Sequence, residues 1–186
     1  MERFLESDLK RIGVFCGAKI GSHESYKDLA VSLGRKFADQ GIGLVYGGAK
    51  IGLMGAIADS VIRNGGNVIG IIPKQILELE VAHTGLSELI KVEGMHERKK
   101  AIYDHSDSFL ALPGGFGTLD ELFEVLTWNQ LSIHKKPVHV LNLSGFFNNL
   151  LLHLDHLVKE GFLAESHRRL VEVFPSVSDW ERNVIC

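Results

Sequence analysis

Short apolar runs alternate along this chain with longer segments in which apolar residues recur every three or four positions. The short runs are rich in Val, Ile and Leu, as in strands buried on both faces, whereas the longer segments have the period of amphipathic helices. Strands are predicted at residues 11–16, 43–46, 67–72, 88–92, 108–112 and 137–141. Helices are predicted at residues 25–40, 53–64, 95–105, 119–131 and 146–160, with a short C-terminal helix from about Ser178. This alternation predicts an α/β fold with a parallel sheet and helices on both faces.

Composition narrows the possible classes of protein. The 186 residues carry 45% hydrophobic and 23% charged side chains with a net charge of −3, which predicts one globular domain over residues 1–186 and no nucleic-acid partner. No apolar stretch reaches about 18 residues and the first eight residues lack the apolar run of a signal peptide, so we expect no membrane partner and a cytoplasmic location. Cys16 and Cys186 are too few for a disulfide framework, and Cys16 is predicted to be a small buried core residue.

Three of the predicted strands are followed by glycine-rich turns, at residues 17–21, 47–55 and 114–117. In a parallel sheet, the loops that leave the carboxyl ends of the strands gather at one edge, where ligands bind. One such turn alone would mean little, because glycine also simply permits a tight turn. Three together predict a ligand-binding cleft at this edge.

The third turn, Pro113-Gly114-Gly115-Phe116-Gly117-Thr118, leads from a predicted strand into a predicted helix. Backbone N–H groups in such a loop, together with the helix N-terminus, can surround a phosphate. The glycines leave room for a ligand against the main chain, and the Thr118 hydroxyl adds a donor. The alternative is an ordinary tight turn with Thr118 as the helix N-cap. We predict that the loop holds the phosphate of a small nucleotide.

Other nucleotide-binding and metal-binding motifs fit poorly. Residues 47–52 have the glycine spacing of a P-loop, but Leu53-Met54 stands where Lys-Ser/Thr is required, which argues against nucleoside triphosphate cleavage. The glycine-rich turns give no Gly-x-Gly-x-x-Gly and no acidic residue ends the second strand, so NAD is a minor alternative. Among nine histidines there is no His-Glu-x-x-His, and His153 and His156 are expected on a solvated helix face, so we predict no metal site.

A charged run, Met95-His96-Glu97-Arg98-Lys99-Lys100, opens the helix before the phosphate loop. Such a run is usually a solvated face. Arg98 and Lys99, however, fall in the first turn, where positive charge opposes the helix dipole. An anionic ligand would remove this conflict, and Arg98 could then clamp phosphate or ribose with its planar fork of donors.

These motifs together resemble those of the LONELY GUY (LOG) family, the cytokinin riboside 5′-monophosphate phosphoribohydrolases. The resemblance rests on Met95-His96-x-Arg98-Lys99 followed by Pro113-Gly114-Gly115-x-Gly117-Thr118-x-x-Glu121, and it extends from about Ile12 to Val173. Members are often labelled lysine decarboxylases, but the sequence contains no motif for a pyridoxal phosphate Schiff base. Ala49 replaces a usual third glycine and Ala18 a common serine, and these departures affect the expected base or ribose preference more than the reaction.

The resemblance implies a Rossmann-like, doubly wound parallel sheet, a homodimer, no metal and no cofactor. It also implies hydrolysis of the N-glycosidic bond of nucleoside 5′-monophosphates to a free base and ribose 5-phosphate. The catalytic pair falls on Arg98 and Glu121. Substrate contacts fall on Glu80, Arg98, Lys99, Gly114, Gly115, Phe116, Gly117, Thr118, Leu119, Asp120 and Thr127.

The residues leave several alternatives open. A carboxylate at Glu121 can stabilise positive charge on the ribose ring and activate water, but Thr118-Leu119-Asp120-Glu121 also spells a capping box, in which Glu121 serves only the helix end. The protein could be a salvage hydrolase of AMP with no hormone role. It could also be a non-catalytic nucleotide carrier or sensor, because fold does not fix function. The joint presence of Arg98 and Glu121 favours an enzyme.

Overall fold

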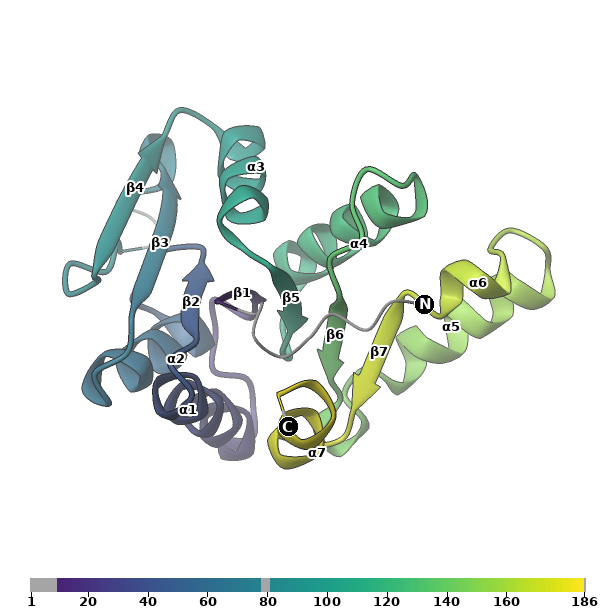
Figure 1. Cartoon of the computed structure of the whole chain (residues 1–186), viewed down its shortest axis with the longest axis horizontal. Coiled ribbons are helices and arrows are strands. Elements are labelled where there is room, and N and C mark those ends of the chain that lie inside the picture. The colour runs from purple at the N-terminus through teal and green to yellow at the C-terminus, as the bar shows by residue number, and fades with distance from the viewer. Residues whose placement is uncertain (1–9, 78–80, 186) are drawn as a thin grey trace.

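The computed structural model describes residues 10–77 and 81–185, and within them seven parallel strands form one sheet (Figure 1). The strands are β1 (Arg11–Phe15), β2 (Gly43–Tyr46), β3 (Val68–Pro73), β4 (Glu88–Val92), β5 (Ser108–Ala111), β6 (Val138–Leu141) and β7 (Val171–Phe174). The helices are α1 (Glu24–Asp39), α2 (Gly52–Arg63), α3 (Met95–His105), α4 (Phe116–Gln130), α5 (Asn148–Lys159), α6 (Glu165–Arg168) and α7 (Val177–Val184). Short 3₁₀ turns are η2 (Lys74–Ile76) and η3 (Leu143–Gly145).

Helices cover both faces of the sheet. On one face, α1, α2 and α7 pack on the strands, and on the other α3, α4 and α5 do so (Figure 1). The inner strands β2, β3, β5 and β6 are buried along their whole length, which explains why they read as continuous apolar runs. The predicted α/β class and the doubly wound parallel sheet are confirmed.

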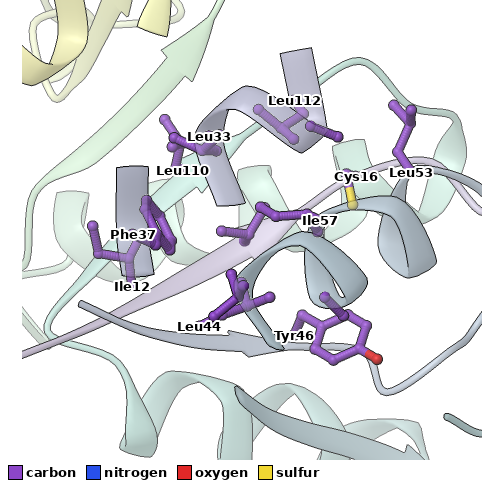
Figure 2. Packing of buried hydrophobic residues seen from close by; sticks show 14 of the residues in the cluster. Ile12, Cys16, Leu33, Phe37, Leu44, Tyr46, Leu53, Ile57, Leu110 and Leu112 are labelled. Carbon is purple, nitrogen blue, oxygen red and sulfur yellow. The ribbon is translucent and has the colours of Figure 1, made fainter. Parts of the chain in front are cut away.

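The core of the first face is built from apolar side chains of α1 and α2 over the central strands (Figure 2). Gly34 allows the two helices to approach closely, because a Cβ there would lie 2.7 Å from the Ile57 carbonyl oxygen. The Ser60 hydroxyl donates to the Val31 carbonyl at 2.7 Å and joins the same helices. This packing fixes α2, whose N-terminus borders the candidate site.

The strand order is β4-β3-β2-β1-β5-β6-β7. The chain builds outward from β1 to β4, crosses back to β5 on the other side of β1, and then builds outward again. The loops that follow β1 and β5 therefore lie next to each other at the switch point, where an open parallel sheet has a crevice.

The structure differs from the sequence prediction at two places. The strand β7 and the short helix α6 were missed. β7 is an edge strand in which the exposed Glu172 interrupts the apolar run, and α6 has only four residues, too few to show a helical period. The helix α4 begins at Phe116, with Gly115 as its N-cap, so the helix predicted from residue 119 starts three residues earlier, and the alternative with Thr118 as N-cap is wrong. Glycines disfavour a helical first turn by propensity, and tertiary packing overrides that preference here.

None of the helices in the described part of the chain is both long and apolar enough to span a bilayer.

Candidate active site

A cavity of about 560 Å³ lies at the carboxyl ends of β1 and β5. Backbone hydrogen bonds tie the three glycine-rich loops together here: the Gly17 N–H donates to the Pro113 carbonyl at 3.1 Å, and the Leu53 N–H donates to the Gly17 carbonyl at 3.0 Å. The predicted cleft is confirmed. Its lining residues are Cys16, Gly17, Ala18, Lys19, Ile20, Gly21, Tyr26, Leu53, Met54, Met95, Arg98, Pro113, Gly114, Gly115, Phe116, Gly117, Thr118, Asp120, Glu121 and Phe146.

The glycines of the third loop serve two different purposes. A Cβ on Gly114 would lie 2.0 Å from Thr118 Oγ1 and 2.9 Å from the Gly17 nitrogen, so the protein itself requires glycine there. A Cβ on Gly115 or Gly117 would meet no protein atom within 4 Å. Because both residues line the cavity, their bare backbone leaves space that a ligand can occupy.

The N-terminus of α4 borders this space. Gly115 is the N-cap and has no side chain to accept hydrogen bonds from the first turn. The N–H groups of Phe116, Gly117 and Thr118 have no intrahelical acceptor by the geometry of a helix start, and the helix dipole adds positive potential. No acidic residue occupies this first turn. The arrangement suits an anion such as phosphate.

Arg98 lies in the first turn of α3 and is buried, with 5% of its surface exposed, whereas His96, Glu97 and Lys100 are exposed. Its Nη2 donates to the Gly47 carbonyl at 2.9 Å. A Cβ on Gly47 would lie 2.1 Å from that nitrogen, so glycine at this position makes room for the guanidinium. The interpretation of the charged run as a solvated face holds for His96, Glu97 and Lys100 but is wrong for Arg98.

Glu121 lines the same cavity as Arg98. It is the sixth residue of α4, counting from Phe116, and a capping-box glutamate would be the third. The capping-box interpretation was therefore wrong, for the same reason that the helix start was misplaced. Glu121 lies too far along α4 to reach the N-cap, and it borders the cavity instead.

Cys16 lies at the floor of the cavity and is buried, as predicted. Burial raises the pKa of its thiol far above the usual range, and the nearby negative charge of Glu121 raises it further. The thiol therefore stays protonated at neutral pH and is a poor nucleophile.

Lys99 does not line the cavity. Its ammonium lies 3.0 Å from Asp120 Oδ2 and 3.4 Å from Glu124 Oε2, which joins α3 to α4. Burial opposes its charge, but the hydrogen bonds and charges of these carboxylates outweigh burial and raise the pKa of Lys99. The structure thus places this predicted substrate contact in a bridge between helices.

Two further predicted contacts lie elsewhere. Leu119 and Thr127 are absent from the cavity lining, and the Thr127 hydroxyl donates to the Phe123 carbonyl at 2.7 Å on an exposed face of α4. Glu80 lies outside the described residues. The structure brings together Arg98, Gly114, Gly115, Phe116, Gly117, Thr118, Asp120 and Glu121.

An apolar wall on the cavity was not predicted from the sequence. The rings of Tyr26 and Phe146 meet edge to face, with centroids 5.6 Å apart, and Ile20, Leu53 and Met54 line the cavity beside them. Tyr26 belongs to α1 and Phe146 follows η3, 120 positions later in the chain. Nothing local in the sequence links these residues, so only the fold reveals the wall.

Within the described residues, no group of three or more His, Cys, Asp or Glu side chains is arranged to hold a metal ion. His153 and His156 are exposed on α5 with ring centroids 6.4 Å apart, which agrees with their predicted solvated face.

Comparison with solved structures shows the same fold. The molybdenum cofactor binding protein of the phototrophic bacterium Rippkaea orientalis superposes with a TM-score of 0.72 at 23% identity. The Moco carrier protein of Chlamydomonas reinhardtii superposes with a TM-score of 0.70 at 24% identity. Each alignment covers 95% of both chains. At these identities the likeness concerns the fold alone.

Comparison of sequences goes further. A family described as "Possible lysine decarboxylase" matches residues 54–183. The cytokinin riboside 5′-monophosphate phosphoribohydrolase LOG1 of Arabidopsis thaliana is 47% identical over 175 residues, which are 94% of this chain and 82% of that protein. The cytokinin riboside 5′-monophosphate phosphoribohydrolase LOG of Oryza sativa subsp. japonica is 48% identical over 173 residues, which are 93% of this chain and 72% of that protein. The chain therefore belongs to the LONELY GUY family of cytokinin riboside 5′-monophosphate phosphoribohydrolases.

Proposed function

We propose that this protein hydrolyses the N-glycosidic bond of nucleoside 5′-monophosphates, including cytokinin ribotides, and releases a free base and ribose 5-phosphate. The observation that carries the proposal is that Arg98 and Glu121 line one cavity with the glycine-rich N-terminus of α4. Identity of 47–48% to phosphoribohydrolases supports the same reaction.

Phosphate binding sets the position of the substrate. The 5′-phosphate occupies the open side of Gly115 and Gly117 and accepts hydrogen bonds from the first N–H groups of α4. Thr118, buried beneath the loop, supports its conformation. Glu121 follows one helical turn later, which brings the ribose within reach of its carboxylate.

The chemistry then falls to Glu121 and Arg98. As the bond from C1′ to the base nitrogen breaks, its electron pair leaves with the base and positive charge develops on the ribose ring. The Glu121 carboxylate stabilises that charge and accepts a proton from the water whose oxygen bonds to C1′. Arg98 clamps the ribose phosphate from within the protein with its planar fork of donors.

The base faces the apolar wall that contains Tyr26 and Phe146. Aromatic edges and aliphatic side chains favour a flat base and an apolar substituent on it. This wall is compatible both with adenine and with N6-substituted adenine, so hormone activation and AMP salvage share the same site chemistry.

A non-catalytic carrier is not favoured. The carrier proteins among the solved structures share the fold at 21–24% identity, and a carrier has no need for a carboxylate beside a buried arginine in the phosphate cleft. The sequence contains no motif for a pyridoxal phosphate Schiff base, so lysine decarboxylation is not favoured either.

Chromatography of released base from several substrates tests the proposal. The panel contains AMP, isopentenyladenosine monophosphate, other nucleoside monophosphates and the matching nucleosides. We expect base and ribose 5-phosphate in equal amounts from monophosphates, and far slower release from nucleosides, because these lack the phosphate. Equal rates for AMP and adenosine would refute phosphate anchoring, and no release from any nucleotide would refute the activity.

We also propose that two copies form a homodimer through the exposed face of α4. Phe123, Thr127 and Leu131 recur on this face at helical spacing, and Ile133 follows them, with 37%, 63% and 59% of Phe123, Leu131 and Ile133 exposed. Family resemblance assigns Thr127 to the nucleotide, yet it does not line the cavity of its own chain. A second copy on this face would account for both observations.

A further inference from the structure

His83 and Asp59 form a histidine–carboxylate pair outside the cavity lining. The His83 side chain is 6% exposed, and its Nε2 lies 3.0 Å from Asp59 Oδ1 on α2. The other ring nitrogen, Nδ1, accepts a hydrogen bond from the Gly85 N–H at 3.1 Å. Since Nδ1 is an acceptor, Nε2 carries the proton and donates it to Asp59. Both ring nitrogens are thus engaged, which fixes the orientation of the imidazole.

The segment that carries His83 pairs through its backbone with the turn after β2. The Lys50 N–H donates to the Val81 carbonyl at 2.9 Å, and the His83 N–H donates to the Gly48 carbonyl at 2.9 Å. Between them, Ala49 and Ala82 pair as an antiparallel bridge. The segment 81–83 therefore acts as a short partner strand for residues 48–50, the turn between β2 and α2.

This turn carries the contact that orients the proposed catalytic arginine. The carbonyl of Gly47 accepts from Arg98 Nη2 at 2.9 Å. The next residue, Gly48, has a φ of +80°, a conformation that suits only glycine well. The Tyr46 hydroxyl donates to the Ala49 carbonyl at 3.2 Å. The position of the Gly47 carbonyl thus depends on how firmly residues 48–50 are held.

We propose that His83 and Asp59 are positioning residues for Arg98. Through the segment 81–83 they hold the turn at residues 47–50, and the turn holds the guanidinium in the cavity. The inference rests on the proposed function, since it concerns the arginine of that reaction. Neither side chain touches the substrate cavity, so their effect on turnover is indirect.

Two substitutions break the pair from opposite sides. His83→Phe keeps a ring of similar size without its nitrogens, and Asp59→Leu removes the carboxylate from a position whose side chain is 46% exposed. Because a displacement of about 1 Å in a positioning group can cost up to about a hundredfold, we expect kcat to fall about tenfold in each. Asp59→Asn keeps an oxygen that accepts from Nε2 and should retain near-parent kcat.

A matched control separates positioning from general loss of an ion pair. Asp155→Leu removes a carboxylate that is 58% exposed and lies 2.7 Å from Arg168, on α5 and α6. It should leave kcat unchanged. In an Arg98→Lys background, His83→Phe should have less than about a twofold effect, since the group that it positions is already replaced.

A second measurement does not depend on activity. The side-chain NMR resonance of Arg98 Nε should shift or broaden in His83→Phe and Asp59→Leu, and stay unchanged in Asp155→Leu. Parent kcat in folded Asp59→Leu, or an unchanged Arg98 resonance, would overturn the positioning role. A parent protein that releases no base from any nucleotide would instead refute the proposed function, and the resonance would still decide the positioning.

Discussion

The guanidinium of Arg98 donates a hydrogen bond to the carbonyl oxygen of Gly47 at 2.9 Å, across 51 positions of sequence. It joins the first turn of α3 to the turn after β2 and holds a buried positive charge beside the phosphate loop. A charge in this position opposes the dipole of its own helix. In the proposed function, an anionic substrate would offset that cost.

Substitution of Arg98 should affect both activity and stability. We expect Arg98→Ala to lower kcat/KM at least about a hundredfold, as when a preorganised charge is removed from a reacting centre. The Gly47 carbonyl loses its charged donor, so the free energy of unfolding should fall by about 1–3 kcal/mol. Steady-state kinetics and urea titrations measure the two effects. Near-parent turnover in a folded Arg98→Ala protein would contradict the clamp.

Substitution of Glu121 should lower activity and leave the start of α4 intact. Because Glu121 is the sixth residue of α4 and not a cap, neither Glu121→Gln nor Glu121→Ala should lose stability through a missing cap. Turnover should fall at least about a hundredfold in both, the lower range for a positioned catalytic group. Thermal melts and base-release assays on the two variants check this. An active Glu121→Gln enzyme would leave the mechanism without its carboxylate.

Two adjacent glycines should respond differently to alanine. Gly114→Ala places a methyl group 2.0 Å from Thr118 Oγ1 and should destabilise the fold by about 1–3 kcal/mol. Gly115→Ala meets no protein atom within 4 Å, so the protein should fold normally. Its KM for AMP should rise about tenfold, equivalent to about 1.4 kcal/mol of lost binding. Unchanged KM in Gly115→Ala would show that phosphate does not occupy this space.

Acid should destabilise the protein through His139. This residue is buried on β6, accepts a hydrogen bond from Trp180 Nε1 at 3.3 Å, and burial lowers its pKa from 6.5 to about 4. Protonation therefore favours the unfolded chain. The stability is full above pH 6.5 and declines as the pH falls toward 4, by up to roughly 3 kcal/mol. Urea titrations across this range measure the loss.

The control for this prediction is His139→Gln, which keeps an acceptor for Trp180 but cannot be protonated. Its stability should depend less on pH between 6.5 and 4. Some slope should remain, since burial also lowers the pKa of His134. An identical pH profile in parent and His139→Gln would assign the acid sensitivity to other groups.

The proposed dimer is tested at Phe123. A carboxylate in the middle of an apolar interface lacks a partner, so Phe123→Glu should yield a monomer in light scattering where the parent is a dimer. The free monomer should keep its fold, because Phe123 is 37% exposed in the single chain. Leu152→Glu, on the exposed face of α5, serves as a control and should leave the dimer intact. A monomeric parent would refute the proposal.

The sequence alone determined the fold class and located the glycine-rich loop for which we propose phosphate binding, because both depend on local patterns. Continuous apolar runs such as Ile69 to Ile72 identify strands buried on both faces, and the glycine-rich run after β5 identifies a tight loop at the sheet edge, in which Gly115 and Gly117 leave open space. Boundaries were accurate to one or two residues where the helical period was strong, as at α1, predicted at residues 25–40 and observed at Glu24–Asp39. They failed at α4, where Gly115 and Gly117 conceal a helix start, and at β7, an edge strand in which the exposed Glu172 interrupts the apolar run.

Only the tertiary structure decided which charges belong to the site. Arg98 and Lys99 are neighbours in one charged run, yet the 100° step between helical positions turns one into the cavity and the other toward Asp120 and Glu124. The same holds for Tyr26 and Phe146, and for His83 and Asp59, which meet through strand order and loop packing. Such contacts depend on how segments far apart in the sequence pack together. A local sequence pattern carries no information about which segments become neighbours in space.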